Sequence, residues 1–217
     1  MTRSTDGNGA APAPRRRMSP QARREVIERA ATEVFAERGY HAASVEEIAK
    51  RSGISVPVLY DHFASKQELH RHLLARHYAE LRAIWHEHLS GDERPEQRVF
   101  RTVDAWFAYV ETHPYAWSML FADTTGQDEA EAIRREVAQE SRAMILPLFA
   151  RVRGADADEM DDETLDLAWE AWRAAIQGMA LWWRGHRHVR RERLVAMAMN
   201  TLWIGLERVR RGESWSL

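Results

Sequence analysis

Hydrophobic residues recur along most of this chain at the three- and four-residue spacing that places them on one face of an α-helix. The first such segment follows Ser19-Pro20, an N-cap with proline at the first helical position, and stops at Gly39. Its apolar face carries Ile27, Ala30, Ala31, Val34 and Phe35. We therefore expect a first helix that begins at Pro20 and ends near Gly39.

Two short helices joined by a tight turn are expected next. Ser44 and Glu47 form a capping box for a helix that ends at Gly53, and Ser55 can cap the second short helix. Glycine adopts the left-handed backbone conformation without steric cost, so Gly53 permits the sharp turn that sets one helix across the other. Together with the first helix, this arrangement predicts a three-helix module that contains a helix-turn-helix.

Helical spacing continues beyond this module, without the alternation that is typical of strands. Pro147 removes an N–H donor and crowds the carbonyl of Ala143, so we expect it to kink or split its helix. The later helices are expected over residues 65–89, 95–111, 114–122, 128–150, 162–185 and 190–211. The sequence thus predicts an all-α chain of about nine helices.

The helix-turn-helix would turn one side to the core and the other to a partner. Five apolar side chains would lock its two helices against the first helix: Val45, Ile48, Ile54, Val58 and Leu59. The residues left on the outer side, where a DNA major groove would meet them, are Ser55, Val56, Pro57, Tyr60, Asp61 and His62.

Four short motifs follow in order within this module: Gly39-Tyr40, the stretch 44–49, Ser52-Gly53-Ile54-Ser55, and Leu59-Tyr60-x-His62-Phe63-x-x-Lys66. In that order they resemble the signature of the tetracycline-repressor (TetR) family. The resemblance covers residues 20–70, and its specificity lies in the ordered combination rather than in any one residue. It implies an N-terminal DNA-binding module followed by a helical bundle that binds a small ligand and forms a homodimer.

The resemblance implies contacts to double-stranded operator DNA from Ser44, Ser55, Tyr60, His62 and Lys66. Tyr60 and Lys66 can donate hydrogen bonds to phosphate oxygens, and helix N-termini offer free N–H groups to phosphates. The chain departs from the family at Val56-Pro57, where many members have Lys or Arg followed by Gly, and at Asp61, where many have an aromatic residue. Val56 and Pro57 join the predicted DNA-binding residues with apolar contacts only, such as to a thymine methyl group.

Charge is distributed unevenly along the chain. Residues 1–77 hold 13 Lys+Arg against 9 Asp+Glu, whereas residues 78–217 hold 18 against 24. A net positive N-terminal third favours a polyanionic partner for that part of the chain. All nine tryptophans lie from Trp85 onward, so the chain also changes in composition at about the same place.

These differences predict three parts. Residues 1–18 would form a disordered basic arm, residues 19–66 the helix-turn-helix DNA-binding domain, and residues 67–217 a ligand-binding and dimerisation domain. The arm contains Arg15, Arg16 and Arg17, which either follow the DNA minor groove or only solvate the tail.

The last two expected helices carry more apolar surface than one neighbour can cover. Each has a heptad-like seam, yet Leu181, Trp182 and Met197 lie off the seams. A second copy of the chain in an isologous four-helix interface is the simplest additional partner, and an entirely intramolecular bundle is the alternative. The predicted dimer interface comprises Trp172, Ile176, Met179, Trp183, Met199, Leu202 and Leu206.

Bulky and adaptable side chains are concentrated in the middle of the chain. Such residues pack a core more often than they line a pocket, but as a group they suit an apolar cavity with a few polar groups. The resemblance implies a small hydrophobic inducer there, whose binding shifts the fourth helix, and we expect an apolar or acyl-type molecule. The predicted ligand-binding residues are Trp85, Trp106, Tyr109, Trp117, Phe121, Met144 and Trp172.

Other chemistry finds little support in the sequence. There is no cysteine and no phosphate-binding glycine loop, and histidines two apart, such as His70 and His72, point to nearly opposite helix faces, so we expect no metal site or cofactor. No stretch approaches the ~20 apolar residues of a membrane helix, and Arg15–Arg17 precede no apolar run. We expect a cytoplasmic protein that is not an enzyme and does not bind a membrane.

The sequence thus predicts a ligand-responsive transcriptional repressor that binds a palindromic operator as a homodimer and is released by a small hydrophobic inducer. Two alternatives stay open. A ligand-free architectural DNA-binding protein would show little sequence preference. An enzyme would use the aromatic C-terminal pocket as its active site, with His113 or Tyr115 as the acid or base.

Overall fold

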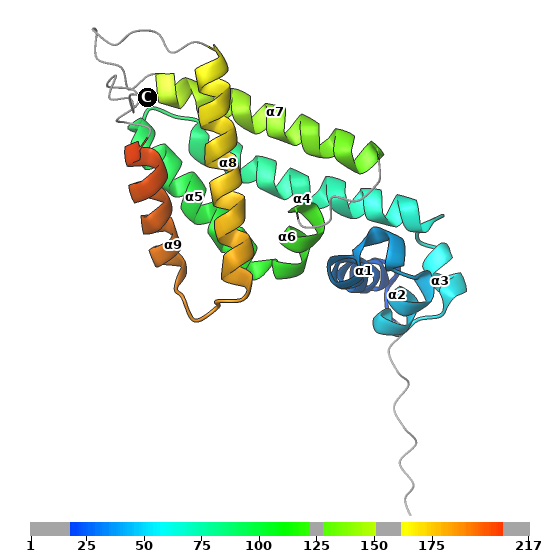
Figure 1. Cartoon of the computed structure of the whole chain (residues 1–217). Coiled ribbons are helices and arrows are strands. Elements are labelled where there is room, and N and C mark those ends of the chain that lie inside the picture. The colour runs from blue at the N-terminus through cyan, green and yellow to red at the C-terminus, as the bar shows by residue number, and fades with distance from the viewer. Residues whose placement is uncertain (1–17, 122–127, 151–161, 206–217) are drawn as a thin grey trace, which may run out of the picture.

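The computed structural model describes residues 18–121, 128–150 and 162–205, and every regular element in these ranges is helical, which confirms the predicted all-α class (Figure 1). The first four helices are α1 (Pro20–Ala42), α2 (Val45–Ser52), α3 (Val56–Tyr60) and α4 (Lys66–Leu89). The later helices are α5 (Pro95–Thr112), α6 (Pro114–Phe121), α7 (Asp128–Ala150), α8 (Asp162–Arg184) and α9 (Arg191–Ala198).

Side-chain caps fix most of the early helix boundaries. The hydroxyl oxygens of Ser19, Ser44 and Ser65 accept hydrogen bonds of 3.0–3.1 Å from backbone N–H groups three residues on. Ser55 is the N-cap residue of α3, as predicted, but its side chain makes no such bond. Pro57, two residues on, has no N–H to donate, and the N–H of Val58, three residues on, does not donate to the Ser55 hydroxyl.

Glycine backbone conformations shape the helix-turn-helix. Gly53 ends α2 in the left-handed region, at φ 69° and ψ 29°, as the sharp turn requires. Gly39, where the first helix was expected to end, has φ 75° and ψ 163° and interrupts α1, which resumes and ends at Ala42. The chain therefore bends at Gly39 before α2 begins.

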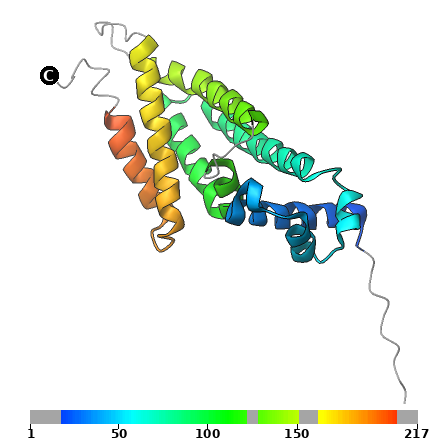
Figure 2. The same cartoon turned by 45° about the vertical axis from the view of Figure 1, so that its right-hand side comes forward.

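α4 links the two parts of the molecule. It packs against α1 at its N-terminal end and against α5, α6 and α7 along the rest of its length. Figures 1 and 2 show α4 and α7 side by side and α9 alongside α5, and in Figure 1 α8 crosses in front of α7 and α5. Any displacement of α4 therefore acts on both the helix-turn-helix and the C-terminal bundle.

A single hydrophobic core joins both parts. Phe35 and Phe63 belong to it in the N-terminal module, Leu73 and Tyr78 in α4, and Trp183 in α8, and all five side chains are fully buried. Burying side chains of this size contributes about 1.5–3 kcal/mol each. The N-terminal module is thus packed directly onto the bundle.

α7 and α9 differ from their expected course. α7 runs through Pro147 without a break, since the hydrogen bond that proline loses falls in the last turn of the helix. α9 ends at Ala198, where a helix to residue 211 was expected, and a π-helical turn (Met199–Trp203) follows. Residues 204–205 are again α-helical, and residues 206–211 of the expected helix, like the arm over residues 1–17, lie outside the described ranges.

Candidate nucleic-acid interface and ligand pocket

The helix-turn-helix has a buried side and an exposed side. Ile48 and Leu59 are fully buried, so α2 and α3 are locked onto α1 as expected. On the outer side, Ser55, Pro57 and Asp61 are exposed, and the side chain of Tyr60 keeps 47% of its surface. Val56 and His62 are partly buried. The short helix α3 thus presents a mixed polar and apolar face to solution.

Lys66 serves a purpose that the sequence did not reveal. Its ammonium donates hydrogen bonds of 2.9 Å to the carbonyl oxygen of Tyr40 and 3.0 Å to that of Ala43. It also lies 4.5 Å from the centre of the Tyr40 ring, a cation–π distance. Lys66 therefore ties the start of α4 to the end of α1 instead of projecting freely towards a phosphate.

Arg24 makes a second set of contacts where α1 meets the residues between α3 and α4. Its guanidinium lies 4.3 Å from the centre of the Phe63 ring and donates a hydrogen bond of 3.4 Å to the carbonyl oxygen of His62. Arg24 thereby fixes the residues that follow α3 against α1. No sequence signal indicated this role, because the partners are almost forty residues apart and belong to different helices.

Positive charge near the helix-turn-helix is partly neutralised. Arg51 pairs with Glu37 at 2.9 Å and Glu47 at 3.3 Å, and its hydrogen bond lowers the pKa of Glu37. Lys50 is exposed and makes no ion pair with another described residue. Lys50 is therefore a cation that remains available to a polyanion on this part of the surface.

A buried carboxylate connects α1 to α4. The Glu28 side chain is only 7% exposed, and its Oε1 atom accepts from Arg24 at 3.1 Å and lies 2.8 Å from Nε2 of His72. Its Oε2 atom forms a short ion pair with Arg76. Because His72 and Arg76 stand one turn apart on α4, this cluster is sensitive to any rotation or shift of that helix.

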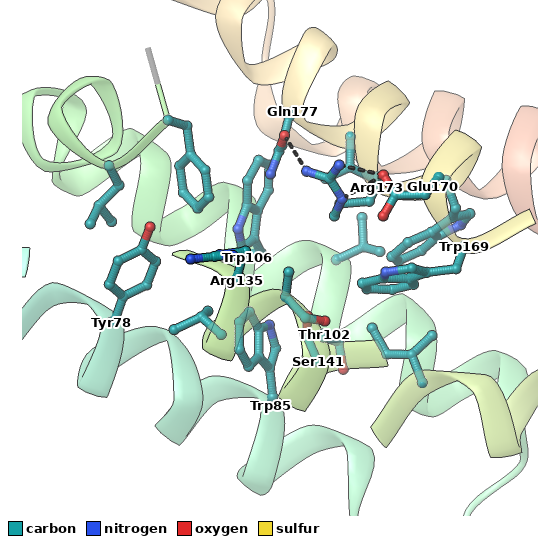
Figure 3. A pocket seen from close by; sticks show the side chains of 18 of the residues that line it. Tyr78, Trp85, Thr102, Trp106, Arg135, Ser141, Trp169, Glu170, Arg173 and Gln177 are labelled. Carbon is teal, nitrogen blue, oxygen red and sulfur yellow. Dashed lines mark hydrogen bonds and ion pairs between the residues drawn. The ribbon is translucent and has the colours of Figure 1, made fainter. Parts of the chain in front are cut away.

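An apolar cavity of about 390 Å³ lies among α4, α5, α6, α7 and α8 (Figure 3). Four of the predicted ligand-binding residues line it: Trp85, Trp106, Phe121 and Trp172. Trp169 also lines it, with its ring stacked on that of Trp172 at 6.2 Å. Trp169 was not among the residues predicted to bind the ligand.

Three of the predicted ligand-binding residues do not line this cavity. Tyr109 is buried elsewhere, with its hydroxyl 2.9 Å from Nδ1 of His77, and burial raises the pKa of this phenol. Trp117 is buried in the core beside Phe121, and Met144 packs against the core. All three are apolar residues at helical spacing, and that pattern does not distinguish a core side chain from a pocket lining.

Polar groups stand at intervals around the apolar wall. Arg173 forms an ion pair with Glu170, and its second nitrogen donates a hydrogen bond of 3.2 Å to Oε1 of Gln177 (Figure 3). Arg135 of α7 also lines the cavity. Hydrophobic walls with few polar groups are typical of sites for small organic ligands.

The predicted dimer-interface residues fall on different surfaces. Trp172, Ile176 and Trp183 are buried within the single chain, and the Trp183 indole N–H donates to the carbonyl oxygen of Val189 at 2.7 Å. The bundle therefore covers this seam itself. Met179, Met199 and Leu202 are partly buried, and Leu206 lies outside the described residues.

The opposite side of α8 is apolar and exposed. Trp182 keeps 50% of its surface and Met197 of α9 keeps 53%, and Leu181 beside them is similarly exposed. Trp182 and Met197 also line a groove between the two helices, together with Gly178 and Met179. We refer to Leu181, Trp182 and Met197 as the α8–α9 patch.

Two kinds of site are absent from the described part of the chain. None of its helices is long and apolar enough to cross a membrane. No group of three or more His, Asp or Glu side chains there could hold a metal ion.

Comparison with known proteins identifies the relatives of this arrangement. Residues 27–73 match the sequence profile described as bacterial regulatory proteins, tetR family, and residues 95–205 match that of the tetracyclin repressor-like C-terminal domain. The chain is 30% identical over 194 residues to the HTH-type transcriptional activator FasR of Mycolicibacterium smegmatis, covering 89% of this chain and 87% of that protein. It is 35% identical over 111 residues to the HTH-type transcriptional repressor KstR2 of Mycobacterium tuberculosis, covering 51% of this chain and 52% of the other.

Solved structures show the same fold. A TetR-like transcriptional regulator from Rhodococcus sp. RHA1 matches with a TM-score of 0.72 at 20% identity, over 88% of this chain and 99% of that one. The fatty acid degradation regulator FadR from Bacillus halodurans matches with a TM-score of 0.60 at 20% identity, over 82% and 96%.

Proposed function

This chain belongs to the tetR family of bacterial regulatory proteins and is a helix-turn-helix transcriptional regulator rather than an enzyme, and we propose that it is a ligand-released repressor. In this proposal a homodimer binds a palindromic operator in the cytoplasm. A small hydrophobic molecule in the cavity then releases the protein from DNA.

The main support for the proposal is that α4 contacts both the cavity and the DNA-binding module. Tyr78 and Trp85 of this helix line the cavity, while His72 and Arg76 of the same helix hold Glu28 of α1. A ligand that requires α4 to move would therefore disturb the helix that carries the DNA-binding module. A ligand shifts such an equilibrium only by its preference for one state, and a coupling of about 1–3 kcal/mol changes DNA affinity about 5- to 150-fold.

The exposed face of α3 is the proposed base-reading surface. Tyr60 and Ser55 would donate to phosphates, His62 would reach a phosphate or a base edge, and Val56 and Pro57 would make apolar contacts. The N-terminus of α2, capped by Ser44, would lie near a phosphate. We assign Lys66 a positioning role, because backbone carbonyls occupy its ammonium.

The α8–α9 patch is the proposed dimer interface. It is exposed in the single chain and is continuous with an apolar groove, as an isologous interface would require. Two modules held about one helical turn of DNA apart would read the two halves of a palindrome. Of the interface residues expected from sequence, Met179 borders this patch.

The cavity suits an apolar or acyl-type ligand. Its walls are mainly aromatic and aliphatic, and its volume lies at the lower end of the usual range for small-molecule sites, about 300–1,000 Å³. FadR, which shares the fold, is described as a fatty acid degradation regulator. That description supports an acyl-type ligand as the first to test.

Activation of transcription is a second candidate output, since FasR, which resembles this chain over most of its length, is described as an activator. A promoter–reporter fusion carrying the operator distinguishes the two. Loss of the protein raises expression if it represses and lowers expression if it activates.

Selection of bound fragments from random duplex DNA tests the DNA-binding part of the proposal. The full-length protein should enrich an inverted repeat at near-physiological salt, and Tyr60→Ala should recover little of it. Tyr115→Ala is a matched control, because Tyr115 is similarly exposed but lies on α6, away from the helix-turn-helix. An architectural protein would instead recover DNA without a shared motif, which would overturn the proposal.

A further inference from the structure

Arg135 is a charged side chain at the apolar cavity without a partner among the described residues. It lines the cavity from α7, and its guanidinium makes no ion pair or hydrogen bond with any other described residue. In Figure 3 its side chain extends into the space between Tyr78 and the Trp106–Gln177 pair. A cation beside an apolar wall favours an anionic group attached to an apolar body.

We propose that the pocket takes a monocarboxylate with an apolar chain and that Arg135 binds its carboxylate. This inference rests on the proposed function, because it names the ligand of the same pocket. The planar guanidinium presents paired N–H donors whose spacing matches the two oxygens of a carboxylate. The carboxylate of the ligand would thus supply the negative charge that no described residue places beside Arg135.

The other arginine of the pocket is not available for this purpose. Arg173 is paired with Glu170 and donates a hydrogen bond to Gln177, so its charge is already balanced. Arg135 is therefore the cation that a bound anion would meet.

Gln177 can add a second contact. Its Oε1 atom accepts from Arg173, which leaves its amide NH₂ as a donor, and Gln177 lines the same cavity as Arg135. Figure 3 shows Trp169 on the side of the cavity away from Tyr78, and Trp172, stacked on Trp169, lines the cavity too. The apolar chain of the ligand would run from Arg135 towards these two rings.

Titration of tryptophan fluorescence with decanoate, 1-decanol and decyl phosphate tests the assignment on the full-length protein, since four tryptophans line the cavity. Decanoate should bind more tightly than 1-decanol. Arg135→Gln should weaken decanoate binding about tenfold or more and leave 1-decanol unchanged, because hydrogen bonds to charged groups are worth more than neutral ones. Arg94→Gln, a highly exposed arginine outside the cavity, should change neither.

The possible failures are distinguishable. If 1-decanol binds as well as decanoate in the wild type and Arg135→Gln affects neither, the carboxylate assignment is wrong and the proposed apolar pocket stands. If only decyl phosphate depends on Arg135, the anionic group is a phosphate and the assignment is again wrong. If none of the three changes the fluorescence, both this inference and the ligand-binding part of the proposed function fail.

Discussion

Nε2 of His72 on α4 lies 2.8 Å from Oε1 of Glu28 on α1, and the Glu28 carboxylate is almost fully buried. Arg24 and Arg76 complete the cluster around it. The junction between the DNA-binding module and α4 therefore depends on a single carboxylate shared by three side chains. Glu28 is far more buried than any of these three partners. Its burial therefore determines most of the loss of stability when its carboxylate is replaced by a neutral group.

Glu28→Gln should lower the free energy of unfolding by about 1–3 kcal/mol, since it removes the buried charged acceptor that Arg24, His72 and Arg76 share. Urea denaturation followed by circular dichroism measures this change. Glu87→Gln on the exposed face of α4 is the control and should change stability little. Equal stability of the two variants would show that the Glu28 cluster does not hold the junction.

Lys66→Ala should also destabilise the protein, by about 1–3 kcal/mol, because the carbonyl oxygens of Tyr40 and Ala43 lose their donor. Its effect on the salt dependence of DNA binding is the more informative measurement. A residue that does not contact a phosphate leaves the slope of log K against log salt concentration unchanged. A slope smaller by about one per protomer would instead assign Lys66 to a phosphate.

Trp182→Glu combined with Met197→Glu should convert the proposed homodimer to a monomer, because it places two charges in the α8–α9 patch. Sedimentation equilibrium measures the mass of the particle directly. Phe100→Glu adds the same charge at a similarly exposed position on α5 and should leave the dimer intact. A double variant that keeps the mass of a dimer would place the interface elsewhere.

His77 should make stability depend on pH. Burial lowers its pKa from the ordinary 6.5, outweighing the nearby carboxylate of Glu80, while Arg76 and His113 lower it slightly further. Tyr109, whose hydroxyl faces His77, stays neutral in this range because burial raises its pKa. As the pH drops below 6.5, His77 is therefore protonated in the unfolded chain while it stays neutral in the folded protein. The free energy of unfolding falls over this range, down to the native pKa.

Urea denaturation at pH 7.5 and at pH 5.5 measures this effect. His77→Gln should lose less stability than the wild type between the two, by up to about 1.4 kcal/mol, because pH 5.5 lies one unit below the ordinary pKa of 6.5. His188→Gln, at an exposed position, should behave as the wild type does. If His77→Gln shows the same pH dependence of stability as the wild type, His77 has the same pKa in the folded and unfolded protein, which contradicts this prediction.

The sequence predicted the helices well because capping residues and apolar spacing are local signals. Ser19 and Ser44 cap their helices as expected, whereas the side chain of Ser55 stands at the N-cap position without accepting an N–H. Whether an aromatic residue lines a pocket depends on contacts between distant helices, and of the predicted residues Trp85 lines the cavity whereas Tyr109 does not.

Residue roles at the junction and in the bundle also depended on distant contacts. Lys66 has the spacing of a DNA-binding lysine, and only the folded chain shows its ammonium on the carbonyl oxygens of α1. Similarly, the heptad-like seam through Trp172 and Trp183 gave the correct buried face of α8 without indicating that its own chain buries it. Periodicity identifies an apolar face but not the partner that covers it.

Coupling between the cavity and the DNA-binding module is tested most directly by measuring affinity for the selected operator duplex with and without a ligand that saturates the tryptophan fluorescence change. The ligand should weaken DNA binding about 5- to 150-fold, and saturating DNA should weaken ligand binding by the same factor. Identical DNA affinity in the presence and absence of the bound ligand would contradict the proposal that α4 transmits occupancy of the cavity to the helix-turn-helix.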